Sequence, residues 1–335
     1  MKTASYFTVQ EGRKVRCELC PHHCLLAEGK RGICLTRRNM QGELVSLNYC
    51  RPVSSHIDPI EKKPLYHFHP GSEIFSCGPN GCTFRCLFCQ NHEIADSIVP
   101  TTEISADSFA KMVIESHTVG IAYTYSEPYI WFETIMEAGA VVKEHGLNNV
   151  MVTNGFMEPA PLSDLLSVVD AMNIDIKSIR PDFYRRMCKA DLEPVLRTCE
   201  TAKKGCHIEI TNLIIPGQND SADELHDLTD YIASNLGRDT PLHLSRYFPR
   251  NKAVYPPTPE STLNRAWEIA REKLDYVYVG NIESRDKSNT FCPSCGELLI
   301  KRSGYAVDVS PSACSRGNGK LLSCPSCGFE TNIIL

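Results

Sequence analysis

The 335-residue sequence contains no run of roughly 18 apolar residues, which is the length that a membrane-spanning helix needs. Between Met1 and Phe7 it also lacks the apolar core that is typical of a signal peptide, so we expect a cytoplasmic protein. An excess of positive charge is missing as well, since 35 Lys and Arg residues face 40 Asp and Glu residues. Binding to nucleic acid in bulk needs a basic surface, so we expect neither a membrane nor a nucleic-acid partner.

Cysteine is too rare for a disulfide scaffold, yet it is clustered. The 17 cysteines are about 5% of the chain, below the roughly 8–10% of disulfide-rich proteins. In a cytoplasmic chain, clustered cysteines are typical of metal or iron–sulfur sites. None lies between Gln90 and Met187. The distribution predicts a Cys-rich extension over residues 1–70, a larger domain over residues 71–285 and a small Cys-rich domain over residues 286–335.

The larger domain is predicted to alternate short strands with helices. An apolar run at Gly120–Tyr125, for example, precedes a helical pattern over Tyr129–His145. Such alternation predicts an α/β fold of parallel strands joined by right-handed crossovers, either doubly wound or a barrel. Polar residues follow five predicted strands, namely Glu127, Asn154, Lys177, Asn212 and Arg246. Because a β/α barrel carries its chemistry at the carboxyl ends of its strands, we favour a full or partial barrel.

The central cysteine motif predicts an iron–sulfur cluster with one open iron. Cys82, Cys86 and Cys89 form a Cys-x3-Cys-x2-Cys run just after the first predicted strand. A four-iron cluster usually has one thiolate on each iron, so three thiolates leave the fourth iron open to a substrate or cofactor. The alternative is a zinc site completed by Cys77 or His92. We favour it less, because zinc sites rarely use such a three-ligand run.

This motif, with Phe88 before its last cysteine, resembles that of the radical S-adenosylmethionine (SAM) superfamily. Thr124–Pro128 resembles the superfamily's Gly-Gly-Glu-Pro motif, with the glycines replaced. Thr153–Phe156 and Asp175–Lys177 resemble segments of the pyruvate formate-lyase activating enzymes. The resemblance implies a radical SAM barrel.

From end to end, the chain most resembles the radical SAM enzyme of the AmmeMemoRadiSam system. The segments that carry this likeness are Cys17–Cys24, Asp58–Phe68 and Gly280–Asn281, the last of which precedes a tail similar to a zinc ribbon.

The resemblance implies a [4Fe-4S] cluster on Cys82, Cys86 and Cys89, with SAM on the fourth iron. One electron from the cluster would cleave SAM to methionine and a 5′-deoxyadenosyl radical, which abstracts a hydrogen atom from a substrate. Similarity to activating enzymes implies a protein or peptide substrate and an electron donor such as a flavodoxin or ferredoxin. The alternative function is a zinc-ribbon binding module without radical chemistry.

The resemblance also implies roles for residues around the cluster. Glu127, with the backbone of Ser126, would bind the amino group of SAM. Lys177 would meet its carboxylate, and Phe88 would pack near its adenine.

Further roles are implied at the ends of later strands. Asn154, which follows Glu127 in the order of the family's motifs, would belong to the residues that bind the cofactor. Asp175 with Thr153 could hold a monovalent cation, although Val152 stands where the activating enzymes carry an acid. Arg246 lies near the strand end that bears a ribose-contacting histidine in those enzymes.

The tail predicts a metal site of its own. Its ligands are two Cys-x2-Cys pairs, each followed by glycine: Cys292, Cys295, Cys324 and Cys327. Paired knuckles of this kind are typical of a tetrahedral zinc ribbon, with a rubredoxin-like iron site as the alternative.

The head is less diagnostic. Its four cysteines are Cys17, Cys20, Cys24 and Cys34, with His22 and His23 as alternative ligands. Zinc or an auxiliary iron–sulfur cluster would fit, and we slightly favour zinc because four thiolates form a closed structural site. A second cluster could relay electrons to the first. The segment Asp58–Gly71 either lines the active-site entrance or wraps the barrel as a linker.

Overall fold

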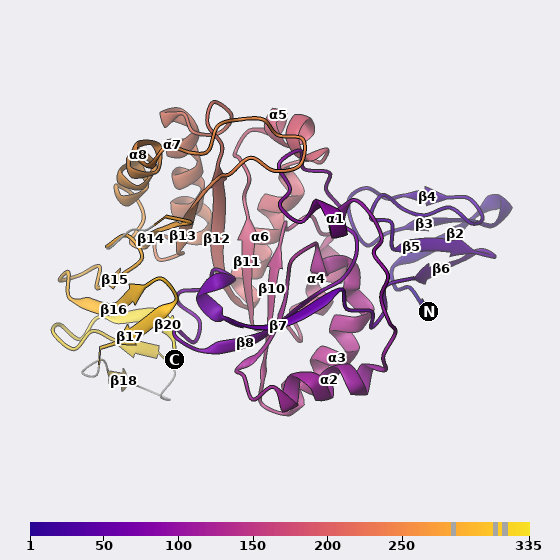
Figure 1. The fold of residues 1–335 in the computed structure, drawn as a ribbon, viewed down its shortest axis with the longest axis horizontal. Helices are drawn as coiled ribbons and strands as arrows, with labels where there is room; N and C mark the ends of the chain where they lie inside the picture. Colours follow the sequence, from indigo (N-terminus) through magenta and orange to yellow (C-terminus); the bar gives the residue numbers. More distant parts are fainter. Residues whose placement is uncertain (283–285, 311–313, 317–320) are drawn as a thin grey trace.

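A computed structural model of the protein describes residues 1–282, 286–310, 314–316 and 321–335. Its centre is an eight-stranded sheet in the order β14-β13-β12-β11-β10-β9-β8-β7 (Figure 1). The strands are β7 (Ser54–Pro59), β8 (Glu73–Gly78), β9 (Gly120–Tyr123), β10 (Asn148–Thr153), β11 (Ala171–Asp175), β12 (His207–Ile214), β13 (Leu242–Arg246) and β14 (Val277–Gly280). Strands β8 to β14 run parallel in chain order, and β7 pairs antiparallel with β8 at the edge.

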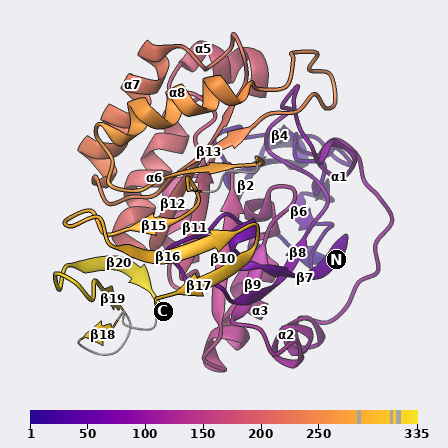
Figure 2. The same ribbon diagram turned by 60° about the vertical axis from the view of Figure 1, so that its left-hand side comes forward.

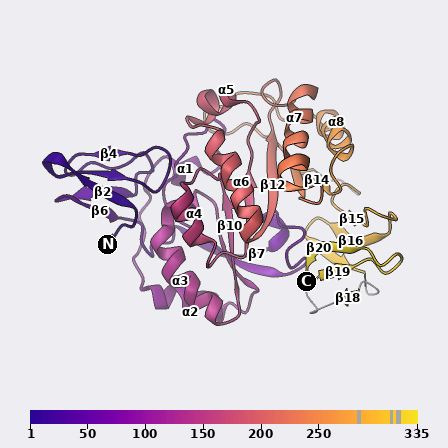
Figure 3. The ribbon, with the colours of Figure 1, turned by 180° about the vertical axis from the view of Figure 1, so that it is seen from behind.

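Helices cover one face of this sheet, as Figure 3 shows from behind. They are α2 (Ala106–Glu115), α3 (Phe132–Glu144), α4 (Pro159–Leu165), α6 (Glu193–Gly205), α7 (Ala222–Tyr231) and α8 (Glu260–Arg271). The shorter helical segments are η1 (Glu11–Arg13), η2 (Ile60–Lys62), α1 (His92–Ala95), η3 (Pro128–Trp131), α5 (Pro181–Phe183), η4 (Tyr184–Cys188) and η5 (Ile232–Leu236).

The winding confirms the predicted α/β barrel and specifies its partial form. A doubly wound sheet reverses its strand order at a switch point, whereas here each strand lies beside the next one in the chain. Among the described strands, β14 and β7 form the two open edges, so the barrel is not closed. Local sequence places the elements as expected; for example, the Ser105 hydroxyl caps α2 by accepting from the Ser108 amide.

A strap between β7 and β8, residues 60–72, fills the concave face at the amino ends of the strands. Its apolar residues Ile60, Leu65 and Phe68 form one cluster with side chains from four neighbouring strands: Ile74, Ala122, Val150 and Ala171. The Glu209 carboxylate on β12 accepts hydrogen bonds from the strap amides of Tyr66 and His67. The strap therefore closes the amino end of the barrel and leaves the carboxyl end for a site. The strand before the strap, β7, is itself part of the large sheet.

The Cys-rich head and tail lie at opposite ends of the molecule (Figures 1 and 2). The head has two three-stranded sheets, one of β1 (Lys2–Thr3), β6 (Glu43–Ser46) and β5 (Arg37–Met40), the other of β2 (Phe7–Gln10), β3 (Lys14–Cys17) and β4 (Leu25–Leu26). The tail also has two, one of β15 (Thr290–Phe291), β16 (Leu298–Ser303) and β17 (Ala306–Val309), the other of β18 (Cys314–Arg316), β19 (Leu321–Ser323) and β20 (Glu330–Ile334). In the described part of the chain, no helix is long and apolar enough to cross a membrane.

Candidate active site

The loop that bears Cys82, Cys86 and Cys89 begins at the carboxyl end of β8. Two glycines allow its close approach to neighbouring backbone: a Cβ on Gly78 would lie 2.1 Å from the Thr124 carbonyl oxygen, and one on Gly81 would lie 2.2 Å from that of Cys34. The three cysteines are partly exposed. The loop is therefore held tightly while its thiols face the carboxyl end of the barrel.

A second segment, at the end of η4, braces this loop. The amide of Arg85 donates to the Cys188 carbonyl (2.9 Å), and the amide of Leu87 donates to the Met187 carbonyl (3.0 Å). The Cys188 thiol is hydrogen-bonded to that of Cys86, a contact that raises the pKa of Cys86 well above its ordinary value together with burial. Sequence analysis left Cys188 unassigned, because it is separated from the motif by about a hundred residues and no local spacing marks it.

Glu127 is buried beside the cysteine loop and is fully engaged by hydrogen bonds. Its carboxylate accepts from the Thr153 hydroxyl (2.6 Å) and from the amides of Asn154 (2.8 Å) and Tyr129 (3.1 Å). Burial raises the pKa of this carboxyl to about 7, although these hydrogen bonds oppose the rise. The predicted residue Glu127 thus joins the ends of β9 and β10 directly next to the loop.

Asp175 and Lys177 form an ion pair at the end of β11, with 2.7 Å between Asp175 Oδ2 and Lys177 Nζ. Burial by itself would lower the pKa of Lys177, but the negative charge of Asp175 and the nearby Cys86 thiol raise it above its ordinary value. Lys177 is therefore held as a cation close to the cysteine loop. Because Asp175 pairs with Lys177 and Thr153 bonds to Glu127, both groups of the expected cation site have protein partners.

Asn154 connects the end of β10 to the loop itself. Its side-chain amide donates to the Thr83 hydroxyl (3.0 Å) and approaches the Cys82 sulfur (3.7 Å). The Ser126 hydroxyl donates to the Pro79 carbonyl just before the loop (2.6 Å). The structure thus gathers five predicted residues at one end of the barrel: Ser126, Glu127, Asn154, Asp175 and Lys177.

Two further predicted residues have their recorded partners outside this group. Phe88 is buried, with its ring 6.0 Å from that of Phe183. Arg246 follows β13, but its guanidinium donates to the Thr258 carbonyl (2.9 Å) and stacks over the Phe248 ring. Asn212, the other polar residue predicted at a strand end, donates to the Ile176 carbonyl inside the sheet.

The strap contributes charged side chains above its apolar part. Asp58 at the end of β7 pairs with Lys62 and with the buried Lys63, each at 2.7 Å, and accepts from the Tyr125 hydroxyl at 2.9 Å. Burial would raise the pKa of Asp58, but the hydrogen bonds from the two lysines outweigh it and hold the pKa below its ordinary value. Since Tyr125 is two residues from Glu127, this segment borders the candidate site as well as plugging the barrel.

At the other end of the molecule, the tail cysteines form a compact group. The sulfurs of Cys292 and Cys327 are 3.7 Å apart and those of Cys295 and Cys324 are 3.6 Å apart, with all four within 4.8 Å of one another. Four sulfurs on one tetrahedral zinc ion, each at about 2.3 Å, would lie about 3.8 Å apart. The tail is therefore shaped to hold a single metal ion and is compatible with a zinc ribbon.

Comparison with known proteins identifies the central domain. A family model for the radical SAM superfamily matches residues 78–229, which span the cysteine loop and the strand ends described above. Its radical SAM domain makes the chain a member of that superfamily. Over their full lengths, this chain and an uncharacterized protein of Methanocaldococcus jannaschii are 42% identical.

More distant relatives agree with this assignment. The radical SAM domain region is 24% identical over 163 residues to the pyruvate formate-lyase 1-activating enzyme of Escherichia coli, covering 45% of this chain and 65% of that enzyme. The crystal structure of a radical SAM methyltransferase from Sphaerobacter thermophilus aligns with this chain with a TM-score of 0.52 at 16% identity. The alignment covers 69% of this chain and 71% of the other. The two proteins therefore share a fold. Membership of the superfamily implies an enzyme that works with a [4Fe-4S] cluster and SAM.

The residues present fit that pair of cofactors. Three cysteines on one loop provide thiolates for three irons and leave one iron to SAM. The charged groups next to them, Glu127 and the Asp175–Lys177 pair, match the charges of the amino-acid part of SAM.

Proposed function

We propose that this protein is a radical SAM enzyme that abstracts a hydrogen atom from a protein or peptide substrate, in the manner of an activating enzyme. The observation that carries the proposal is the convergence of the cysteine loop with Glu127, Asn154 and Lys177 at the carboxyl end of a partial barrel. Cys82, Cys86 and Cys89 would hold the [4Fe-4S] cluster. When bound, the cluster and SAM supply a 5′-deoxyadenosyl radical through a one-electron cleavage.

The chain's own residues hold and orient the amino-acid part of SAM. Lys177 keeps its proton because Asp175 stabilises the ammonium, so it attracts the SAM carboxylate. Glu127 attracts the SAM amino group once it is ionised, and its hydrogen bonds from Thr153 and Asn154 fix the direction of its carboxylate. Such fixed charges orient a ligand without further rearrangement.

Packed side chains limit the access of solvent to the site from two sides. The strap fills the amino end with packed apolar side chains, and the head covers the loop from the other side through Cys34 and Gly81. A reactive intermediate needs a site from which water is excluded. The sequence similarity to pyruvate formate-lyase activating enzymes supports a protein or peptide substrate over a small metabolite.

The proposal extends to the surroundings of the enzyme. A one-electron donor such as a flavodoxin or ferredoxin would reduce the cluster, and the protein would work in the cytoplasm. Similarity to the radical SAM enzyme of the AmmeMemoRadiSam system supports a role for this chain in that system. The compact sulfur group of the tail supports a zinc ribbon that acts as a structural domain.

Anaerobic purification followed by chemical reduction tests the proposal. We expect the wild-type chain to cleave SAM to methionine and 5′-deoxyadenosine, as measured by chromatography. Cys86→Ala removes a ligand and should abolish cleavage. Cys206→Ala, which replaces the cysteine directly before β12, should retain it. Cleavage that survives in Cys86→Ala would refute the proposal, and a wild-type protein with zinc but no iron would favour a binding module.

A further inference from the structure

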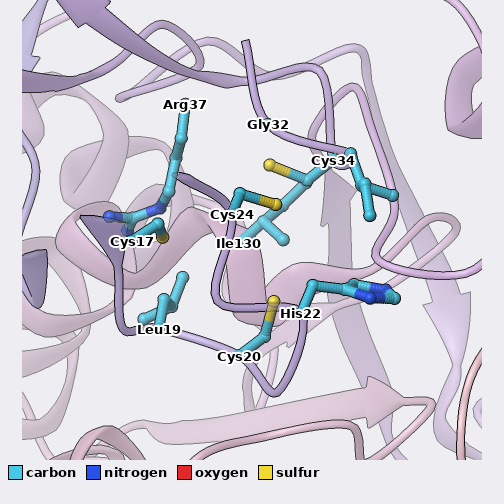
Figure 4. Close-up of a pocket in the computed structure, with 10 residues that line it drawn as sticks. Cys17, Leu19, Cys20, His22, Cys24, Gly32, Cys34, Arg37 and Ile130 are labelled. Carbon is cyan, nitrogen blue, oxygen red and sulfur yellow. The ribbon is translucent and has the colours of Figure 1, made fainter. Parts of the chain in front are cut away.

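We propose that the head is a second iron–sulfur site, in which Cys17, Cys20, Cys24 and Cys34 bind an auxiliary cluster and not zinc, the alternative that the sequence analysis slightly favoured. The four thiols line one small cavity together with Leu19, Ile130 and Arg37 (Figure 4). Cys17 is the last residue of β3, Cys20 and Cys24 lie in the turn that joins β3 to β4, and Cys34 lies in the loop before β5. The site is thus assembled from two segments around an enclosed, mostly apolar space.

The spacing of the sulfurs separates a cluster from a single ion. In the described residues, the tail cysteines form the one group of three or more metal-ligating side chains whose ligand atoms all lie within 4.8 Å of one another. No three head thiols are that close, and neither are those of Cys82, Cys86 and Cys89. Thiolates that bind different irons of a cluster lie farther apart than thiolates on one ion. The head therefore matches the radical SAM loop of the same chain and differs from its zinc-like tail.

Arg37 supplies an independent indication of a ligand in the cavity. Its guanidinium is 1% exposed, donates to the Ser5 carbonyl (2.9 Å) and pairs with Glu133 (2.6 Å). Its third nitrogen, Nε, is also a donor, and it is buried and lacks a hydrogen-bond partner among the described residues. A buried donor without an acceptor is costly, and the sulfurs of a cluster accept such bonds. The positive charge beside Cys17 and Cys34 also compensates for the negative charge of four thiolates.

The head site directly contacts the loop of the first cluster. His22, which lies between Cys20 and Cys24, donates from Nε2 to the Thr83 carbonyl at 2.8 Å. On the other side, the Cys34 carbonyl lies where a side chain on Gly81 would be. The ligand segments of the two sites are therefore in contact at two points, and a cluster in the head would be a close neighbour of the catalytic one.

A variant without the central ligands isolates the head site. We expect the full-length triple variant Cys82→Ala/Cys86→Ala/Cys89→Ala, purified anaerobically and reconstituted with iron and sulfide, to retain about four irons and four sulfides per chain. It should also retain one zinc, in the tail. The iron should be accompanied by an iron–sulfur absorption band that weakens on reduction. An electron paramagnetic resonance signal should appear after reduction.

The opposite results would overturn the inference. A triple variant that contains two zinc ions and no iron, or no metal beyond one zinc, would show that the head holds no cluster. In the reverse experiment, Cys20→Ala/Cys34→Ala should lower the iron of the wild-type chain from about eight to about four, and Cys206→Ala should leave it unchanged. Because the triple variant reports on the head without SAM cleavage, failure of this inference is distinguishable from failure of the proposed function.

Discussion

Gly81 is a residue at which the head packs tightly against the catalytic loop. Its φ angle is +93°, and a Cβ would lie 2.2 Å from the Cys34 carbonyl oxygen and 2.8 Å from the Thr36 methyl. Gly146 also has a positive φ, +73°, but nothing lies within 4 Å of the corresponding Cβ position. The two glycines therefore share the backbone constraint and differ in their surroundings.

We expect Gly81→Ala to destabilise the protein more than Gly146→Ala and to lower the iron content. Alanine in the left-handed region costs roughly 1–2 kcal/mol at either position. Only at Gly81 must the head also move away from the loop. Thermal unfolding and iron analysis of both variants check this prediction, which equal effects on stability and iron would contradict.

At the scale of elements, the strap is the part of the fold that connects the barrel to the tail. Arg302 on β16 is fully buried, donates to the Tyr66 carbonyl (2.8 Å), lies 3.7 Å from Glu61 and stacks over the Tyr66 ring. Removal of one partner from a buried ion pair leaves an uncompensated charge.

Arg302→Met should therefore lower the free energy of unfolding by about 3–5 kcal/mol. Arg238, which pairs with Asp275 at the surface, provides the control. Arg238→Met should change the free energy of unfolding by less than about 1 kcal/mol. Urea unfolding measures both. Similar losses in the two variants would show that the strap contact does not contribute as the structure indicates.

His67 makes the strap sensitive to acid. Its Nδ1 bonds to Asn332 of the tail and its Nε2 to the Tyr278 hydroxyl, both at 2.6 Å. Burial lowers the pKa of His67 to about 3, although the nearby charge of Glu209 opposes this. Because the folded-state pKa lies below the unfolded one, the contribution to stability is complete above about pH 6.5 and is lost as the pH falls towards 3.

Between pH 7 and pH 5, the wild-type chain should thus lose about 2 kcal/mol more stability than His67→Gln, which cannot titrate. Urea unfolding at the two pH values measures the difference. Parallel pH dependence of the two proteins would mean that His67 is not held neutral.

For the whole molecule, the partial barrel has a different Cys-rich unit at each end. The head lies against the catalytic loop through His22 and Cys34, and the tail lies against the strap through Arg302 and Asn332. The tail has a small core of its own, formed by Leu299, Ile300, Leu322 and Ile333 together with two of its cysteines. A core this small would depend on a bound metal for its stability.

Loss of the tail metal should therefore destabilise the protein without affecting the catalytic site. We expect Cys324→Ser to remove one zinc per chain and lower the melting temperature by several degrees, with iron content unchanged. Ser326→Ala, in the same knuckle, should keep the zinc. A parallel loss of iron in Cys324→Ser would show that the two ends of the barrel are coupled.

The sequence by itself determined what depends on neighbours along the chain. The spacing of Cys82, Cys86 and Cys89 and the twin knuckles of the tail are local patterns, and the family comparison and the sulfur geometry agree with them. The alternation of strands and helices likewise follows from local periodicity, and β8 to β14 confirm it.

Only the tertiary structure decided what depends on distances between remote segments. It showed that the sheet stays open, that the strap lies inside the barrel, that Cys188 contacts Cys86 and that the Arg246 guanidinium donates to the Thr258 carbonyl. It also distinguished the widely spaced head thiols from the compact tail thiols. A spacing in the sequence identifies metal ligands, but the separation of their sulfurs, which sets the size of the bound group, is fixed by the packing of the segments that carry them.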